Sequence, residues 1–447
     1  AETLQTKEFG VTNNLVGLGL SSLLSMRLGA KLQKELGLHL MMKEIMENPT
    51  VRELAVLASD ADHTVDKEVA FKPHPVQEYY PMTDSQRSMY LDCLMYPDSI
   101  IYNIPCYARF KGMDVDRLEA SIREVIEAHP YMKVRLKEVG DDVVQVRDDN
   151  APVKIGRERL TVRPTKELLQ SYIHPFDLKN EPLYRFNIFE FMDEVYLLAD
   201  MHHLVTDGTS NNVVMNDLLK VYHGEKLQKE EYTAYDRALD EDALIKSDRA
   251  MEAEAYFDKL VGGIDNTVYP HSTTPDNANK QGVVEMEIAC AAIDAYCKRH
   301  SLTPGNFFME VFHQVLHRIT REENTLLYFI SNGRSELMLE NFFGVLVKTL
   351  PTVETSFKGS MADIVEAMGQ QINQTVKNDF YPFTKIVERH KLKAEIIFNY
   401  VVDMIKTSDL GKECIESQVL EWDMAKTPLS ITMQRAANGN YLSVMEY

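Results

Sequence analysis

Two adjacent histidines followed by an aspartate give this sequence its clearest capacity for chemistry. They lie in the run His202-His203-Leu204-Val205-Thr206-Asp207-Gly208. A histidine has an ordinary pKa of about 6.5, so it can take or give a proton near neutral pH. Seen alone, such a pair at the end of a strand is more often packing or loop structure than a catalytic site. A metal site is the least favoured interpretation, because the spacing is not that of two ligands on a helix and no third ligand is evident.

A serine near the N-terminus is the second candidate for chemistry. Ser22 lies in the run Leu18-Gly19-Leu20-Ser21-Ser22-Leu23, before leucines spaced four apart as on one face of a helix. A phosphate ester on a serine at a helix N-terminus is stabilised by unpaired N–H groups and by the helix dipole. Without further context, either Ser21 or Ser22 is more often an ordinary helix cap.

The histidine pair follows a strongly apolar run, Val195-Tyr196-Leu197-Leu198-Ala199, which predicts a buried strand. A helix is predicted next, over residues 211–222. Because side chains alternate along a strand, the two imidazole rings should lie on opposite sides and only one should face a cleft. The site is therefore expected where a strand ends in a loop before a helix, a common place for catalytic groups.

The remaining pattern favours a mixed α/β (α+β) fold in several parts. Residues 1–58 read as a small helical unit, and residues 59–80 as a polar, proline-punctuated linker. Residues 81–255 and 256–447 each mix helices and strands, with a Gly262-Gly263 break near their junction. One long polar helix over residues 241–260 is predicted to bridge these two halves.

Composition excludes several classes of partner. The 447 residues carry 48 Lys and Arg against 68 Asp and Glu, a formal charge of −20 that repels nucleic-acid phosphates. No apolar run approaches the roughly 20 residues that span a bilayer, and no signal-peptide pattern begins the chain. The 5 cysteines are scattered and form no Cys-x-x-Cys pair, which predicts free thiols in a reducing, cytoplasmic compartment and no zinc site.

Five blocks, in order along the chain, resemble the motifs of condensation domains of nonribosomal peptide synthetases. They are Tyr80–Arg87, Glu127–Arg135, His202–Gly208, Phe343–Pro351 and Asp379–Phe383. The resemblance implies two lobes with the fold of chloramphenicol acetyltransferase, arranged as a V-shaped pseudo-dimer. It makes residues 81–255 the N-lobe and residues 256–447 the C-lobe.

The same resemblance implies a reaction and roles for the motif. The activity is amide bond formation between a carrier-bound aminoacyl or peptidyl thioester and the amine of a downstream carrier-bound acceptor. His203 faces a tunnel between the lobes and acts either as a base or by orienting the amine. Asp207 is architectural, and its expected partner is Lys133 or Arg135, of which Lys lacks a bidentate fork. Lys348 stands where the family has Asn, with no predicted consequence.

The run around Ser22 resembles the attachment motif of peptidyl carrier proteins. The resemblance makes Ser22 the residue that receives 4′-phosphopantetheine and implies three partners: an adenylation domain, a downstream acceptor carrier and a phosphopantetheinyl transferase. Only Ala1 to Glu8 remain for the long first helix of a carrier, and the chain stops at Tyr447, where the family continues into another helix. We therefore expect a sequence trimmed at both ends.

Four alternatives remain open beside this interpretation. Epimerisation domains share the fold, but the Glu they need is absent from the corresponding stretch, Phe329–Glu336. Heterocyclisation is disfavoured because its Asp-x-x-x-x-Asp replacement is missing. Non-catalytic recruitment domains usually lose the histidine pair, and a free-standing acyltransferase using coenzyme A would not need the carrier. With no epimerisation domain between carrier and condensation segments, the order of domains implies an L-configured donor.

Overall fold

The computed structural model describes most of the chain beyond the N-terminal unit. The described residues are 9–15, 20, 25, 28–29, 31–32, 36, 38, 40, 44–45, 48–58, 71–140, 142–267, 282–300, 302–334, 339, 341–401, 410–420, 427–436 and 438–447. Ser22 and its neighbours Leu18, Gly19, Ser21 and Leu23 therefore lie outside them.

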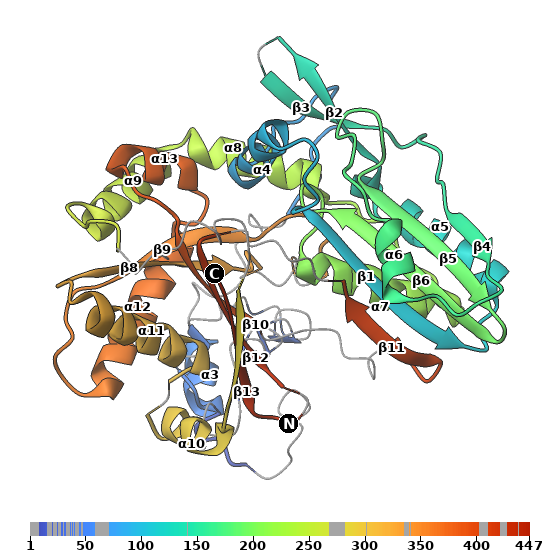
Figure 1. Cartoon of the computed structure of the whole chain (residues 1–447). Helices are drawn as coiled ribbons and strands as arrows, with labels where there is room; N and C mark the ends of the chain where they lie inside the picture. Colours follow the sequence, from blue (N-terminus) through green and yellow to red (C-terminus); the bar gives the residue numbers. More distant parts are fainter. Residues whose placement is uncertain are drawn as a thin grey trace.

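Two separate β-sheets organise two lobes (Figure 1). The first sheet has the order β11-β1-β6-β5-β4, built from β1 (Asn103–Lys111), β4 (Gly156–Arg159), β5 (Tyr184–Phe191), β6 (Glu194–His202) and β11 (Cys414–Val419). β6 contains the apolar run predicted as a buried strand, and eight of its nine residues are buried. It pairs antiparallel with both β1 and β5, so it runs through the centre of the sheet.

Helices α5 (Val115–Ala128) and α7 (Gly208–Tyr222) contact each other and contribute to the core beside the first sheet. The apolar residues along one face of α5 are buried: Leu118, Ile122, Val125 and Ile126. The smaller elements of this lobe are α4 (Asp84–Met95), η3 (Pro130–Lys133), β2 (Val134–Val139), β3 (Asp142–Arg147) and α6 (Lys166–Ser171).

The second sheet has the order β7-β13-β12-β10-β8-β9. Its strands are β7 (Val283–Ile288), β8 (Thr325–Ser331), β9 (Lys348–Glu354), β10 (Ile396–Val401), β12 (Leu429–Arg435) and β13 (Tyr441–Glu446), accompanied by α10 (Cys290–His300), α11 (Pro304–Thr320), α12 (Met361–Lys377) and α13 (Phe383–His390). Inside this lobe, His313 is fully buried between the hydroxyls of Thr325 and Thr352. Burial lowers the pKa of His313 to about 3, so it is a neutral core residue.

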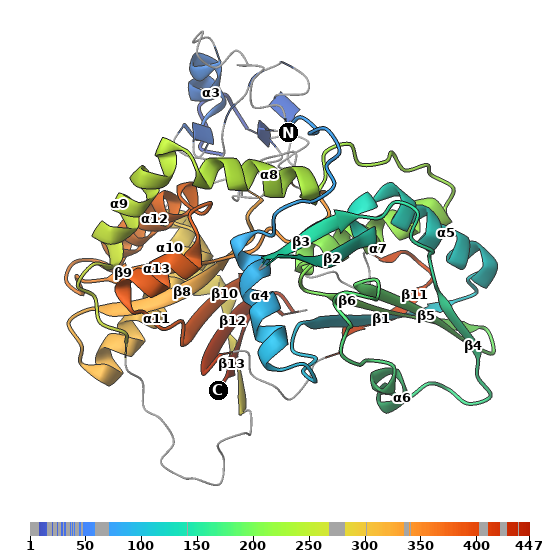
Figure 2. The ribbon, with the colours of Figure 1, turned by 90° about the horizontal axis from the view of Figure 1, so that it is seen from above.

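The single bridging helix predicted over residues 241–260 is wrong. Two helices occupy this stretch, α8 (Ala234–Ile245) and α9 (Asp248–Val261), and they extend between the two lobes (Figure 2). At the break, the Ser247 hydroxyl donates to the carbonyl of Leu244 over 2.7 Å. A serine that bonds nearby backbone in this way competes with helix continuation, which the polar pattern alone did not reveal.

The chain also crosses back into the first lobe after the second has begun. β11 pairs antiparallel with β1, Cys106 opposite Val419. Further residues from beyond position 256, Leu339, Phe342, Phe343, Leu346 and Leu410, join the core of the first lobe. The predicted C-lobe of residues 256–447 is thus not confined to one sheet, because its connecting segments complete the other.

The N-terminal unit has a small core of its own. Leu15, Leu20, Leu40, Ile45 and Leu54 are buried together. Its last helix, α3 (Val51–Leu57), begins after Thr50, whose hydroxyl accepts from the N–H of Glu53 over 3.2 Å. Within the part of the chain that the structure describes, no helix is both long and apolar enough to cross a membrane.

Candidate active site

The first histidine of the pair is buried and hydrogen-bonded inside the protein. His202 ends β6 opposite Asn103 of β1, and its side chain is 3% exposed. Its Nδ1 accepts from the N–H of Leu204 over 3.1 Å, which places the proton of the neutral ring on Nε2. That Nε2 lies 3.7 Å from the Cys93 sulfur. His202 therefore holds the turn that follows the strand.

A buried ion pair joins Asp200, on the same strand as His202, to Arg185 of the neighbouring β5. Asp200 accepts from Asn103 over 2.9 Å and from Arg185 over 3.1 Å. Burial raises the pKa of Asp200 to about 6, although Arg185 and Asn103 act in the opposite direction. The Arg185 guanidinium lies 3.6 Å from the centre of the Phe176 ring, which in turn packs edge-on against His202.

The second histidine lies just past the strand in a different environment. The backbone N–H of His203 donates to the carbonyl of Tyr102 over 2.7 Å, which continues the pairing of β6 with β1 by one residue. His203 is half-buried, more exposed than either His202 or Asp207. The two rings thus have different surroundings.

Asp207 is the N-cap of α7 and is completely buried. Its Oδ1 accepts from the N–H of Ser210 over 2.9 Å, and its Oδ2 accepts from the N–H of Leu346 over 3.0 Å. The guanidinium of Arg334 donates to both oxygens, over 2.8 Å and 3.0 Å. Arg334 is only 3% exposed, so this is a buried bidentate ion pair between the two lobes.

The hydroxyl of Ser210 extends this contact between the lobes. It donates to the carbonyl of Gly344 over 2.7 Å and accepts from Arg334 over 2.9 Å. The N–H of Gly344 also lies 3.0 Å from the same hydroxyl. The first turn of α7 is therefore bonded both to Arg334 and to the loop before β9.

The partner predicted for Asp207 is wrong. Lys133 donates instead to Glu127 and, over 3.0 Å, to the carbonyl of Asp149. Arg135 lies 3.8 Å from Asp148. Lys133 lies in η3 and Arg135 in β2, and both bond to acceptors of the first lobe. Asp207 is covered instead by residues of the second lobe.

Sequence patterns did not identify Arg334, although it stands in the stretch 329–336 that lacks the Glu of epimerisation domains. The residue before it, Gly333, lets the backbone turn so that Arg334 reaches Asp207. Gly333 has φ 64°, a region that suits glycine, and a Cβ there would lie 1.9 Å from the carbonyl oxygen of Leu346. Only a residue without a side chain lets this turn approach the loop so closely.

Gly208, the last residue of the histidine motif, has the opposite surroundings. It is exposed, and a Cβ built on it meets no described heavy atom within 4 Å. Its backbone does not require glycine. The absence of a side chain leaves the start of α7 accessible beside the histidine turn.

A buried, charged histidine supports α7 from the other side. His129 Nε2 lies 3.1 Å from Asp217 of α7, and its Nδ1 lies 3.1 Å from Glu230. Glu230 also accepts from the N–H of Phe343, which belongs to the same loop as Gly344. Burial alone would lower the pKa of His129, but the two carboxylates outweigh it and raise the pKa to about 9.

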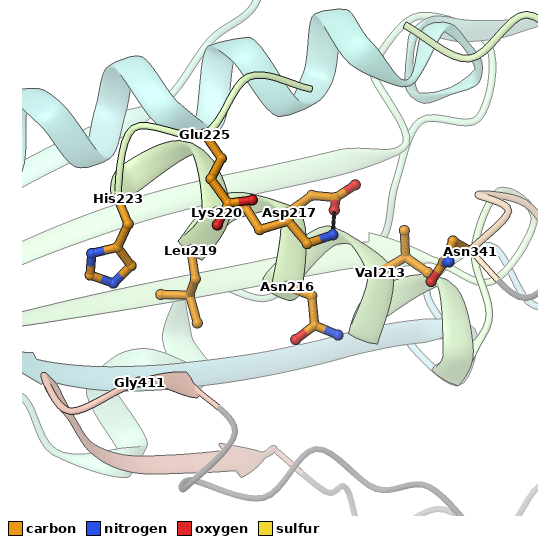
Figure 3. A pocket seen from close by; sticks show the side chains of 9 residues that line it. All are labelled: Val213, Asn216, Asp217, Leu219, Lys220, His223, Glu225, Asn341 and Gly411. Atoms are coloured by element: carbon orange, nitrogen blue, oxygen red, sulfur yellow. Dashed lines mark hydrogen bonds and ion pairs between the residues drawn. The ribbon is translucent and has the colours of Figure 1, made fainter. Parts of the chain in front are cut away.

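A pocket of about 350 Å³ lies along α7 (Figure 3). Its lining residues are Val213, Asn216, Asp217, Leu219, Lys220, His223, Glu225, Asn341 and Gly411. Asp217 joins it to the buried network, because one carboxylate oxygen accepts from Lys220 and the other faces His129. Neither histidine of the motif is among the residues that line this pocket.

Lys348, which departs from the family motif, has a clear structural role. Its amine donates to Glu241 of α8 over 2.5 Å, and Glu241 is buried. The substitution of Lys for Asn therefore adds an ion pair between the connecting helix and the start of β9.

No group of three or more His, Cys, Asp or Glu side chains in the described ranges is arranged to hold a metal ion. All five thiols are free, and burial is the first cause of the raised pKa of Cys93 (about 11) and Cys106 (about 12).

Comparison with known protein families assigns both parts of the chain. The model described as "Condensation domain" matches residues 76–441. The model described as "Phosphopantetheine attachment site" matches residues 1–57.

Curated relatives are peptide synthetases much longer than this chain. Surfactin synthase subunit 2 of Bacillus subtilis (strain 168) is 26% identical over 429 residues, which cover 94% of this chain and 12% of that protein. Tyrocidine synthase 3 of Brevibacillus parabrevis is 26% identical over 407 residues, covering 88% of this chain and 6% of that protein. The chain thus spans a small fraction of the relatives that it matches.

Solved structures agree on the fold. The condensation domain of the Monacolin K polyketide synthase MokA has a TM-score of 0.72 at 16% identity, covering 83% of this chain and 92% of that one. The X-domain solved in complex with OxyB from teicoplanin biosynthesis has a TM-score of 0.72 at 17% identity, covering 85% and 90%. The first condensation domain of the calcium-dependent antibiotic synthetase, with a substrate analogue, has a TM-score of 0.67 at 15% identity, covering 83% and 91%. The predicted acetyltransferase-like fold is confirmed.

Removing the guanidinium of Arg334 should destabilise the protein strongly. In Arg334→Ala, Asp207 is left as a buried charge without its partner, which costs about 3–5 kcal/mol of unfolding free energy. Arg334→Lys should recover little, because an amine cannot donate to both oxygens in a fork. Urea unfolding followed by circular dichroism measures the change. The matched control is Arg135→Ala, a more exposed cation whose loss should cost at most about 1 kcal/mol. Equal stability of the two alanine variants would contradict this assignment.

The His129 network predicts a loss of stability at alkaline pH. The pKa of His129 is raised to about 9 in the folded protein. Its charged form therefore contributes fully below the unfolded pKa of about 6.5, and the contribution, at most roughly 3 kcal/mol, is lost as pH rises through about 9. Urea midpoints of the wild type and His129→Gln, measured between about pH 6.5 and about pH 9.5, should converge as pH increases. A constant difference between the two curves would show that His129 is not charged.

Proposed function

Because this chain belongs to the condensation-domain family, we propose that it forms an amide bond between two carrier-bound substrates and that His203 acts on the attacking amine. The donor is an aminoacyl or peptidyl thioester, and the acceptor is the amine of an aminoacyl group on a downstream carrier. The observation that carries this proposal is that the residues of the histidine motif differ in burial and in bonding. His202 and Asp207 are buried and bonded to the framework, whereas His203 is half-buried at the open start of α7.

The proposed chemistry is a transfer of one proton at His203. As the amine nitrogen bonds to the donor's carbonyl carbon, that nitrogen must lose a proton, and a neutral imidazole can take it near neutral pH. The C–S bond breaks, and the same proton can pass to the departing sulfur, so His203 ends neutral. The fixed backbone of His203 also supports orientation of the amine, which alone contributes several kcal/mol.

The carrier segment is proposed to present the donor. The match of residues 1–57 to a phosphopantetheine attachment site supports Ser22 as the serine that carries the arm, although Ser22 lies outside the described residues. When bound, 4′-phosphopantetheine supplies the thiol on which the donor acyl group is held as a thioester. Leu20, within the motif, and Ser25, two residues after it, are buried in the carrier segment.

The order of the two parts suggests the partners and the configuration of the donor. The carrier precedes the condensation domain with no epimerisation domain between them, which supports an L-configured donor. Its loading needs a phosphopantetheinyl transferase and an adenylation domain, and the acceptor arrives on a separate downstream carrier. A cytoplasmic location fits the five free thiols.

Ser22→Ala should abolish attachment of the arm. Incubation of the wild type with a phosphopantetheinyl transferase and coenzyme A should add the mass of one phosphopantetheine, read by intact mass spectrometry. Ser21→Ala is the matched control and should still be modified, because only one of the two serines occupies the attachment position. Modification that persists in Ser22→Ala would place the arm elsewhere.

His203→Ala should lower amide formation by roughly 10²–10⁴-fold, the usual contribution of a positioned acid–base group. The assay uses a donor loaded on Ser22 and a separate loaded acceptor carrier, with product measured by mass spectrometry. Folding and Ser22 loading should stay at wild-type levels, because the His203 side chain is only half-buried. Asp207→Ala should instead lose stability together with activity. Near-normal product from folded His203→Ala would refute the proposed role.

A further inference from the structure

We propose that Tyr102, tied to Asp92 of helix α4, is a positioning residue that sets the orientation of the His203 ring. The inference rests on the role proposed for His203, but it concerns geometry and can be tested apart from activity. Tyr102 precedes β1, and the register that places Asn103 opposite His202 places Tyr102 beside His203. The carbonyl of Tyr102 accepts from the backbone N–H of His203 over 2.7 Å.

The ring of Tyr102 contacts both histidines of the pair. Its centre lies 6.5 Å from that of His203, with the two planes at 83° in an edge-to-face arrangement. Its centre lies 6.2 Å from that of His202. Aromatic rings that pack in this way restrict each other's rotation and contribute stabilisation beyond simple burial. The position of the Tyr102 ring therefore limits the rotation of the His203 ring about its side-chain bonds.

The hydroxyl of Tyr102 fixes that ring to α4. It donates to a carboxylate oxygen of Asp92 over 2.6 Å, a short bond with a charged acceptor. Burial, followed by this bond, raises the pKa of Tyr102 above its ordinary value, so the hydroxyl keeps the proton that it donates. The next residue of α4, Cys93, contacts His202 through its sulfur. Two consecutive residues of one helix thus reach the two consecutive histidines, one directly and one through Tyr102.

Helix α4 is also held at its other end by the second lobe. Asp84 accepts from the hydroxyl and, over 3.2 Å, from the N–H of Thr384 at the start of α13. The Ser85 hydroxyl donates to the carbonyl of Val347 over 3.3 Å. Figure 2 shows α4 between the two sheets. The orientation of His203 is therefore coupled, through Tyr102 and α4, to the placement of the second lobe.

The test removes the hydroxyl of Tyr102 and keeps its ring. In Tyr102→Phe, the ring-current effect on neighbouring protons remains, so a changed imidazole signal reports a displaced ring. We expect the ¹³C–¹H signal of the His203 imidazole, assigned with His203→Gln, to shift in folded Tyr102→Phe. We expect Asp92→Ala to produce the same shift, since it removes the other half of one bond, and the double variant to add nothing further. Asp92→Asn keeps an acceptor oxygen and should lie closer to the wild type.

Tyr107→Phe is the matched control. Tyr107 lies in β1, the strand that Tyr102 precedes, where it stands opposite Leu198 and donates its hydroxyl to Glu416 over 2.5 Å. It should leave the His203 signal unchanged. An unchanged signal in Tyr102→Phe as well would overturn the inference.

Activity separates this inference from the proposed function. If both hold, kcat of Tyr102→Phe should fall roughly 10-fold with KM for the acceptor nearly constant, because a small misplacement of a catalytic group acts on the chemical step. A shifted signal combined with full activity in both Tyr102→Phe and His203→Ala would support the positioning and refute the role of His203. An unshifted signal overturns the positioning whatever the activity.

Discussion

The buried ion pair between Asp207 and Arg334 is the contact on which the arrangement of this site depends. An ion pair in a protein interior loses much of its attraction to desolvation unless further hydrogen bonds compensate. Here the carboxylate also accepts from the backbone N–H groups of Ser210 and Leu346, and the guanidinium also donates to the hydroxyl of Ser210. The charges are satisfied only when the two lobes are in contact, so the start of α7 takes its form from the second lobe.

Because Asp207 must contact the second lobe, the residues of the seven-residue motif have different roles. Asp207 joins the lobes, and His202 closes the turn by accepting from the N–H of Leu204. Gly208 leaves space where a side chain would otherwise project. His202 and Asp207 therefore maintain a backbone arrangement, Gly208 leaves space beside it, and we propose that the side chain of His203 does the chemistry near neutral pH.

Sequence patterns predicted the local elements well and the long-range contacts poorly. The apolar run of β6 identifies a strand, and the spacing of apolar residues in α5 identifies a helix. Both patterns indicate which side chains are buried, and each can be read from its own segment alone. The partner of Asp207 depends instead on which distant segment covers it, and 127 residues separate it from Arg334. The crossing of β11 to β1 was missed for the same reason, since periodicity shows that a face is buried but not what covers it.

Two independent sets of contacts now connect the second lobe to the histidine turn. One passes through Arg334 to Asp207 and the start of α7, on the C-terminal side of the pair. The other passes through α4 to Cys93 and, by way of Asp92, to Tyr102, which contact the pair from a different element. A histidine that orients an amine must be held to within about 0.5 Å of its working position. A turn held from two sides by the same lobe meets that requirement only when the lobes are correctly placed, so a shift between the lobes should change the reactivity of His203 before it changes the stability of the fold.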